Sequence, residues 1–440
     1  MIRKFYTILC LALCFSTHGQ IDSLRLEYDY FTLPNGLEVI FQPDQNVDQV
    51  SVEFWIKNGT SMDRPEQYGL QHFFEHVLPY SPMDSISKNK FFDDYLKGSN
   101  AQVKKDFSRF YLKVIPEGID LALERASGRL MAGADKITER RVEYERKRVL
   151  AEIKRNARNP KWSAKGSLVI HEGTFGKGHP YAANGYGNIE NNEGFSLDDF
   201  RQRYNNMVYA ENIILFVVGH FDDLKVKQLV YDYFGNIKSK QKRPIEFSKP
   251  VLQSNQSISM KAPHPEDVLN TVIFSWAIPE WTLKDDAALK LVAAHLNNSF
   301  TSKNGLPLSV VKSGAYTDMH KVAGQFYIEI KFSDANDSAK IDQLVSGKIK
   351  DLLKKHMTTH DLNLAKKSEI ENIKDMQENL GFGWSRTELL GKGLLFRDNP
   401  SMYFERLKIQ QELSAKQLKR MSRKWLNKKP FKVSFTANDL

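Results

Sequence analysis

Cysteine is scarce in this sequence, which contains two among its 440 residues, Cys10 and Cys14. Both fall in residues 1–19, whose basic start (MIRKFY) and apolar stretch (TILCLALCF) are typical of a secretory signal peptide. The mature chain would therefore contain no thiol, which excludes disulfide bonds. A lipid anchor on Cys14 is an alternative, but it is less favoured because Leu13 is bulkier than the small residue that such processing prefers.

Long hydrophobic runs are also missing. The apolar part of the leader is too short to span a bilayer comfortably, and no later stretch approaches the ~20 apolar residues that a transmembrane helix needs. We therefore expect a mature protein without a transmembrane helix, exported to the periplasm or to an equivalent compartment.

Acidic residues are fewer than basic ones, 53 against 63, and the formal net charge is +10. The basic stretches KSKQKRP and WLNKKPFK lack interleaved aromatic residues, and no nucleic-acid-binding motif accompanies them, so we expect no nucleic-acid partner. Solvated helix faces account for most of this charge. Attraction to anionic membrane surfaces or to acidic substrates stays open.

The chain contains enough apolar material for two cores. With 41% hydrophobic residues over 440 positions, two domains of roughly 200 residues each are the expectation. The basic, proline-bearing segment 238–262 is typical of a linker. It would join an N-terminal domain, residues 20–237, to a C-terminal domain, residues 263–440.

The order of expected elements begins again after this segment. An Asn35-Gly36 turn between alternating apolar runs indicates a β-hairpin in the first half. Later segments then repeat at an offset of roughly 220 residues: SRFYLKV (108–114) with GQFYIEI (324–330), and VLAEIKRN (149–156) with EIENIKDM (369–376). The repeat predicts an α+β fold of two tandem homologous domains, each a mostly antiparallel sheet covered by helices.

The segment HFFEH, residues 72–76, suggests a metal site. On a helix, residues four apart lie one above the other, so His72 and His76 could direct two nitrogens at one ion about 2 Å from each. Glu75 would be close enough to hold a water molecule bound to that ion. The alternative is an ordinary amphipathic helix with two histidines, because the pattern arises by chance in on the order of one or two chains per hundred.

A zinc ion in such a site needs a third protein ligand, and a catalytic site keeps the fourth position for water. The segment VEYERKRVLAEIKRN offers Glu145 and Glu152, two turns apart on one helix face. Spacing alone does not choose between them. One could bind the metal while the other supports a histidine or the ligand helix.

In these motifs the chain resembles the pitrilysin, insulysin and mitochondrial processing peptidase family, whose zinc endopeptidases carry an inverted H-x-x-E-H motif. The resemblance rests on HFFEH with Glu152 farther along, and on LPNGLEVIF, SNAQVKKDFSRFYLKVIPEGIDLALE and NIILFVVGHFD in family order. It covers nearly the whole mature chain and is stronger in the first half than in the second.

The resemblance implies a catalytic zinc site in the first half. It makes His72, His76 and Glu152 the ligands of one zinc ion per chain. Glu75 would be the general base that takes a proton from the metal-bound water. Glu145 would be a further acidic residue that supports the site.

The resemblance also implies residues that bind substrate. Asn100 and Ala101 match an Asn-Ala pair on the strand edge that pairs with an extended substrate. Tyr316 matches a tyrosine that reaches the substrate from the second half, but Ser309 stands where an arginine accompanies that tyrosine in active family members. Asn372 stands in the repeat where Glu152 stands in the first half, so no second zinc site is expected.

Family members of this length commonly work as two-subunit assemblies that enclose peptides or unfolded segments. A homodimer would lack the arginine, so a heterodimer with a homologous zinc-less subunit is favoured. Two alternatives to a zinc endopeptidase stay open: a non-catalytic structural subunit of a larger assembly, and zinc-dependent peptide capture without turnover. The presence of Glu75 beside the two histidines weighs against the scaffold.

Overall fold

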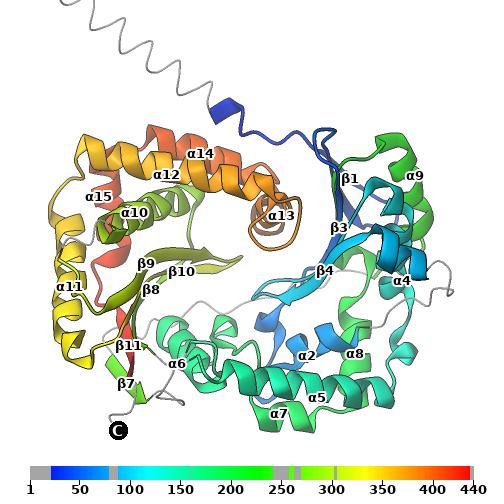
Figure 1. Cartoon of the computed structure of the whole chain (residues 1–440), viewed down its shortest axis with the longest axis horizontal. Coiled ribbons are helices and arrows are strands. Elements are labelled where there is room, and N and C mark those ends of the chain that lie inside the picture. Colours follow the sequence, from blue (N-terminus) through cyan, green and yellow to red (C-terminus); the bar gives the residue numbers. More distant parts are fainter. Residues whose placement is uncertain are drawn as a thin grey trace, which may run out of the picture.

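The structure, a computed structural model, describes residues 21–78, 88–159, 161–240, 257–261, 269–301 and 305–436. The chain forms two halves that lie side by side, each a sheet with helices packed against it (Figure 1). This arrangement confirms the predicted α+β fold. The predicted signal peptide and the alternative lipid anchor on Cys14 fall outside the described residues. Within them, no helix is long and apolar enough to cross a membrane.

The N-terminal half is built on a six-stranded sheet in the order β1-β2-β6-β3-β5-β4. Its strands are β1 (Asp29–Thr32), β2 (Glu38–Pro43), β3 (Val50–Ile56), β4 (Leu96–Val103), β5 (Ser108–Val114) and β6 (Ile213–Gly219). All neighbouring strands pair antiparallel except β2 and β6, which are parallel. β4 is an edge strand, so one side of its backbone has no partner strand among the described residues.

The predicted hairpin at Asn35-Gly36 is confirmed. β1 and β2 pair antiparallel, and the backbone N–H of Leu33 donates to the carbonyl of Leu37 across the turn at 2.8 Å. Gly36 has φ +91°, a conformation that side chains other than glycine rarely adopt. The Asn35 amide donates to the carbonyl of Phe234 at 2.9 Å, so the turn also caps the helix that ends there.

Seven helices accompany this sheet in the described part of the N-terminal half. They are α2 (Leu70–Val77), α4 (Ile119–Met131), α5 (Glu139–Asn156), α6 (Ala164–Phe175), α7 (Ile189–Gly194), α8 (Leu197–Met207) and α9 (Asp223–Phe234). Along β3, side chains alternate between the two faces of the sheet. Val52 and Phe54 join the core formed with α2 and α4, whereas Trp55 joins a core shared with the other half.

The C-terminal half has a five-stranded sheet in the order β7-β11-β8-β10-β9. Its strands are β7 (Ser257–Lys261), β8 (Asn270–Pro279), β9 (Val310–Met319), β10 (Ala323–Phe332) and β11 (Phe431–Thr436). Its helices are α10 (Leu283–Thr301), α11 (Ser338–Lys354), α12 (Thr359–Glu378), α13 (Arg386–Arg397), α14 (Met402–Glu412) and α15 (Ala415–Leu426).

The two sheets share one topology. The order β2-β6-β3-β5-β4 of the first half corresponds strand by strand to β7-β11-β8-β10-β9, including one parallel pair in each, β2 with β6 and β7 with β11. This match confirms the predicted tandem repeat. It also corrects the predicted linker, residues 238–262, because Ser257–Lys261 of that segment forms β7 and belongs to the C-terminal sheet.

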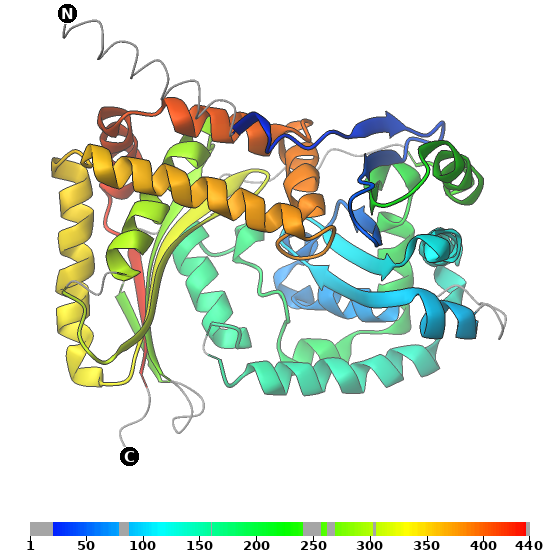
Figure 2. The same ribbon diagram turned by 45° about the horizontal axis from the view of Figure 1, so that its top comes forward.

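The two halves share a core in which α13 packs on the N-terminal sheet. Figures 1 and 2 both place α13 between the two sheets. Leu390 joins Trp55 and Phe216 in one buried cluster, and Gly391 lets the helix approach closely, since a Cβ there would lie 2.5 Å from the Trp55 ring.

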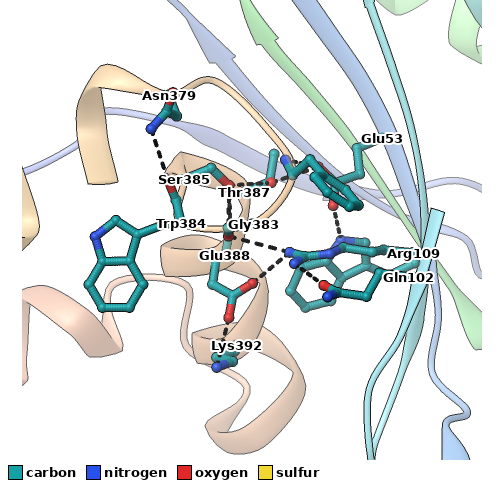
Figure 3. A network of polar contacts seen from close by, with 12 residues as sticks. Glu53, Gln102, Arg109, Asn379, Gly383, Trp384, Ser385, Thr387, Glu388 and Lys392 are labelled. Atoms are coloured by element: carbon teal, nitrogen blue, oxygen red, sulfur yellow. Dashed lines mark hydrogen bonds and ion pairs between the residues drawn. The ribbon is translucent and has the colours of Figure 1, made fainter. Parts of the chain in front are cut away.

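A buried polar network reinforces this contact (Figure 3). Arg109 of β5 donates to Glu388 of α13 at 2.5 Å, and Lys392 contacts the same carboxylate at 2.7 Å. Glu53 of β3 accepts hydrogen bonds from the Thr387 hydroxyl at 2.7 Å and from the backbone N–H of Phe382 at 2.9 Å. Apolar and polar contacts together fix the two halves relative to each other.

Candidate metal centre

α2 carries the HFFEH segment, and its position is fixed from both sides. Phe73, Phe74 and Val77 are fully buried in the core of the N-terminal half. At its start, the Asp63 carboxylate accepts from the backbone N–H groups of Gly69 and Gln71, both at 3.2 Å, which satisfies donors that a helix N-terminus leaves unpaired. The polar face with its two histidines is thereby directed towards α5.

α5 supplies the acidic residues. Val142, Val149 and Ile153 are buried on one side of this helix. Glu145 and Glu152 lie on the same helical stripe, two turns apart. Burial of the three apolar side chains therefore holds Glu145 and Glu152 against α2.

The two histidines and Glu152 converge on one point. The Nε2 atom of His72 lies 3.6 Å from Oε2 of Glu152, and the Nε2 atom of His76 lies at the same distance from the same oxygen. These distances are too long for hydrogen bonds. They match the separation of about 3.4 Å between two ligand atoms that are each ~2.1 Å from a tetrahedral zinc ion. The donor set therefore fits zinc.

Glu75 competes with Glu152 for the third ligand position. Ligand atoms of His72, Glu75 and His76 lie within 4.8 Å of one another, so these three alone could also surround an ion. Glu152 is the better placed of the two glutamates, because one of its oxygens is equally distant from both Nε2 atoms. With Glu152 as third ligand, Glu75 would lie beside an ion rather than bind it.

Burial and neighbouring charges tune these groups. Burial and the charge of His76 lower the pKa of His72 to about 4, so its imidazole is neutral at physiological pH, as a metal ligand must be. The contact with His76 lowers the pKa of Glu152, whose carboxylate stays ionised. Burial raises the pKa of Glu75 to about 7, although the positive charges of His76 and Arg129 oppose that rise.

Glu145 supports His76 rather than joining the convergence point. Its Oε2 atom lies 3.4 Å from the Nδ1 atom of His76, on the side of the ring away from Glu152. The Glu145 side chain is 2% exposed, and Arg141 and Arg148 contact its oxygens at 3.3 and 3.0 Å. A carboxylate behind a ligand imidazole orients the ring and increases its basicity.

Asn100 and Ala101 lie on β4, the edge strand, in register with Tyr111 and Phe110 of β5. Both residues line a pocket that Glu75 and His76 also line. The open strand edge and the candidate metal centre therefore border one space.

Tyr316 and Ser309 belong to the C-terminal half. Tyr316 lies on β9 and stacks on Tyr327 with ring centroids 5.1 Å apart; no described contact joins it to His72 or His76. The Ser309 hydroxyl donates to Asp337 at 2.6 Å. Ser309 thus stabilises the start of α11 instead of presenting a charged group to a substrate.

The corresponding place in the C-terminal half has no imidazole among its lining residues. α10 and α12 correspond to α2 and α5, and they line a small pocket with Asp286, Lys290 and Asn372. Asp286 pairs with Arg406 at 3.3 Å, and burial lowers the pKa of Lys290. In the described residues, this position of the C-terminal half is therefore lined by an ion pair, a lysine and an amide.

Sequence reasoning missed three arginines near the metal centre. Arg125 and Arg129 of α4 and Arg148 of α5 line the same pocket as Glu75 and Asn100. The spacing of Arg125 and Arg129, one helical turn apart, is visible in the sequence. Which helix face meets the metal centre depends on tertiary packing, so the spacing alone gave no signal.

The chain matches two sequence families. Residues 38–179 match the family described as "Insulinase (Peptidase family M16)", and residues 194–369 match "Peptidase M16 inactive domain". The first match contains every residue of the candidate metal centre. The second covers most of the half in which Asp286 and Lys290 replace the imidazoles.

Several proteins are similar over part of the chain. The A-factor-processing enzyme of Saccharomyces cerevisiae is 21% identical over 67% of this chain and 31% of that protein. Zinc protease PqqE of Helicobacter pylori is 25% identical over 67% of this chain and 66% of that protein. Human insulin-degrading enzyme is 25% identical over 52% of this chain and 23% of that protein. The chain thus spans less than two thirds of the length of each of these relatives.

Solved structures share the fold over nearly the whole chain. A protease from Helicobacter pylori superposes with a TM-score of 0.79 at 18% identity, covering 93% of this chain and 99% of that one. The periplasmic protease PqqL from Escherichia coli superposes with a TM-score of 0.75 at 14% identity, covering 94% of this chain and 48% of that one. Pitrilysin superposes with a TM-score of 0.73 at 17% identity, covering 94% of this chain and 45% of that one.

Proposed function

Because the chain belongs to the insulinase family of peptidases, family M16, we propose that it is a zinc-dependent endopeptidase that hydrolyses peptides or unfolded segments. The observation that supports this most strongly is the convergence of His72, His76 and Glu152 on one point, with Glu75 beside it. A scaffold protein has no physical need for a carboxylate placed next to two imidazoles that converge on one point.

Each residue of the centre has a separate task in this proposal. Bound zinc would polarise the scissile carbonyl and lower the pKa of a water molecule. His72, His76 and Glu152 would hold the ion, and Glu145 orients the His76 ring through its Nδ1 atom. Glu75 accepts the proton of the attacking water and passes it to the leaving amine, which is general base and then general acid catalysis.

The substrate binds as an added strand on the edge of β4. Backbone groups of Asn100 and Ala101 pair with an extended peptide, which gives affinity for many sequences. Folded proteins offer few free extended segments, so peptides and unfolded regions are the expected substrates. Tyr316 would contact the substrate only from another subunit or after the halves move, because it lies on the other sheet.

We propose further that the active form is a two-subunit assembly of the exported protein. Ser309 leaves the chain without the arginine that accompanies Tyr316 in active relatives, so a homologous zinc-less partner that supplies it is favoured over a homodimer. An exported, periplasmic location agrees with the expected leader and with the absence of cysteine from residue 15 onward.

Comparison of wild type with Glu75→Gln tests the proposed function. We expect about one zinc ion per chain in both proteins by elemental analysis, and a loss of roughly 10²–10⁴-fold in cleavage of a quenched fluorescent peptide by the variant. Asn would shorten the side chain, whereas Gln keeps its shape, so Gln separates loss of the base from loss of packing.

Two results would redirect the assignment. Wild-type protein purified without chelators and still free of zinc would indicate the structural subunit. Zinc-loaded wild type that binds peptides without cleaving them, also after addition of a homologous partner, would indicate peptide capture without turnover.

A further inference from the structure

A pocket of about 490 Å³ lies in the C-terminal half, between α11, the end of α15 and the strand β8. Figures 1 and 2 both place α11 at the end of the molecule farthest from the N-terminal half. The residues that line this pocket all belong to the C-terminal half, so it is separate from the candidate metal centre. Its volume is in the range of roughly 300–1,000 Å³ that is usual for small-molecule sites.

The floor and one wall of this pocket are apolar. Phe274 and Trp276 of β8 form the floor and are 5% and 4% exposed. Val345, Ile349 and Leu353 follow one another at four-residue steps on the side of α11 that lines the pocket. An alkyl chain placed between β8 and α11 would therefore be removed from water.

The rim of the pocket is positively charged. Within the described residues its lining includes no aspartate or glutamate, but it includes five exposed basic residues: Lys350, Lys354, Arg423, Lys428 and Lys429. The two acidic residues of α11 pair with other lysines. Asp351 contacts Lys355 at 3.0 Å. Asp342 contacts Lys432. The carboxylates of α11 are thus engaged outside this rim.

Two helix ends offset part of the charge. α11 ends at Lys354 and α15 ends at Leu426, and a helix C-terminus carries about half a unit of negative charge. The Nε atom of Arg423 donates to the carbonyl of Leu353 at 2.7 Å, so this arginine caps the last turn of α11. Two helix ends together balance about one of the five positive charges. The rim therefore keeps an excess of positive charge.

The backbone around the pocket favours an alkyl chain over a peptide. β8 is an interior strand that pairs with both β10 and β11, and helices use their interior backbone groups in their own hydrogen bonds. The pocket is thus lined by an interior strand and two helices rather than by a strand edge such as that of β4. A peptide would bury amide groups that need partners, whereas an alkyl chain has none to satisfy.

We propose that this pocket binds a long-chain fatty acid, with its alkyl chain along Trp276 and Ile349 and its carboxylate among the lysines at the ends of α11 and α15. Charge-assisted hydrogen bonds from lysine favour a carboxylate over a hydroxyl group of the same chain length. An alkyl amine would be repelled. The site requires neither zinc nor a peptide, so the inference does not depend on the proposed peptidase function.

The test is displacement of a dansyl-labelled fatty acid from the full mature chain by dodecanoate, dodecanol or dodecylamine, each below its micelle concentration. We expect dodecanoate to displace the probe at a concentration at least about tenfold lower than dodecanol does, and dodecylamine to be the weakest. Equal displacement by all three compounds, or no binding of the probe, would overturn the inference.

Two variants separate the charged rim from the apolar floor. Lys354→Gln/Lys428→Gln should weaken dodecanoate binding by about tenfold and change dodecanol binding by less than about twofold. Ser346→Trp should weaken both ligands, because Ser346 is an exposed residue of α11 that lines the pocket and a larger side chain there would fill it. Circular dichroism and thermal denaturation verify that each variant is folded.

Lys374→Gln/Lys416→Gln is the matched control. Both lysines are exposed, on α12 and α15, and neither lines the pocket, so this variant loses the same net charge at other places. It should bind dodecanoate as wild type does. An equal loss of dodecanoate binding in the two double variants would overturn the inference, because net charge alone would then explain it.

Vesicles of phosphatidylglycerol distinguish a site for a free fatty acid from general attraction to an anionic membrane. Binding to these vesicles without binding to free dodecanoate would overturn the inference and indicate a membrane-facing surface. Binding of dodecanoate that is lost in Ser346→Trp supports the pocket, since a single exposed substitution leaves the lysines of the rim in place.

Discussion

At the scale of single residues, Glu145 and Glu152 differ in what they contact and not in their sequence surroundings. Both lie on the stripe of α5 that faces α2. One oxygen of Glu152 is equidistant from the Nε2 atoms of both histidines, whereas Glu145 contacts the opposite nitrogen of His76 and two arginines. We therefore assign the metal to Glu152 and a supporting role to Glu145.

This assignment predicts unequal effects of two matching substitutions. Glu152→Gln should remove a ligand and leave the protein without bound zinc after dialysis against buffer. Glu145→Gln should retain zinc but weaken its affinity by roughly 10–100-fold, because it loosens the orientation of His76. Competition with a chelator of known affinity measures both. Equal losses in the two variants would contradict the separate roles.

The same residues show what the sequence could and could not predict. Two histidines four apart on a helix imply a shared ligand direction, because helical geometry is local. The choice between Glu145 and Glu152 depends on how α5 packs against α2, which no local pattern contains. The arginines of α4 escaped notice for the same reason.

At the scale of elements, the position of α2 decides whether the centre exists. Gly69 begins this helix with φ +98°, and a Cβ there would lie 2.5 Å from the carbonyl oxygen of Tyr186 and 2.8 Å from the Cα of Gly187. Glycine is thus required twice, once for the left-handed backbone and once for close approach. Asp63, paired with Arg203 at 3.0 Å, then caps the first turn.

Gly69→Ala should therefore destabilise the protein and displace the histidines. We expect a loss of about 2–5 kcal/mol, from left-handed backbone strain together with the clash, and weaker zinc binding. Gly178→Ala is the control, because Gly178 has φ +80° but nothing within 4 Å of a Cβ. It should cost about 1–2 kcal/mol and leave zinc affinity unchanged. Chemical denaturation and zinc titration compare the two; equal effects would argue against the close contact.

Element prediction succeeded where the signal was local. The Asn35-Gly36 hairpin follows from turn chemistry, and the buried run of β6 follows from its apolar residues. The linker prediction did not anticipate β7, because its alternating polar residues, SISMK, gave no strong strand signal. β7 is an edge strand whose conformation depends on pairing with β11.

At the scale of the whole molecule, the contact between the halves contains buried charge as well as apolar surface. Arg109 is 1% exposed and depends on Glu388 for its counter-charge (Figure 3). Burial raises the pKa of Glu388, but the charges of Lys392, Arg109 and Lys104 outweigh it and lower the pKa to about 2, against a usual value of 4.5.

This lowered pKa makes the contact acid-sensitive. The unfolded chain takes up a proton at this position at higher pH than the folded one, so the contribution of Glu388 to stability is full above about pH 4.5 and is lost as pH falls towards about 2. Glu388→Gln should reduce stability at pH 7 by roughly 3–5 kcal/mol, since it leaves Arg109 buried without its partner.

Denaturation of wild type and Glu388→Gln at a series of pH values checks this prediction. The difference in free energy of unfolding should shrink as pH falls from about 4.5 towards 2. Lys355→Gln is a control, because its partner Asp351 forms an exposed pair that contributes at most about 1 kcal/mol. A difference between wild type and Glu388→Gln that stays constant over the whole range would exclude Glu388 as the titrating group.

The duplicated topology explains why the candidate metal centre lies in one half of the described chain and not in both. Both halves place two helices against the same position of an equivalent sheet, but the second half fills that position with Asp286, Lys290 and Asn372. The repeat was visible in the sequence because strand and helix patterns recur in order. The placement of the two halves was not, because it depends on the packing of α13 against Trp55.

The most direct measurement of the central claim is anomalous diffraction at the zinc absorption edge from crystals of the protein grown with zinc. We predict one peak per chain, bonded to Nε2 of His72, Nε2 of His76 and one oxygen of Glu152 at about 2.0–2.2 Å. A peak bonded to Glu75 while Glu152 points away, or no peak between α2 and α5, would contradict the proposed centre.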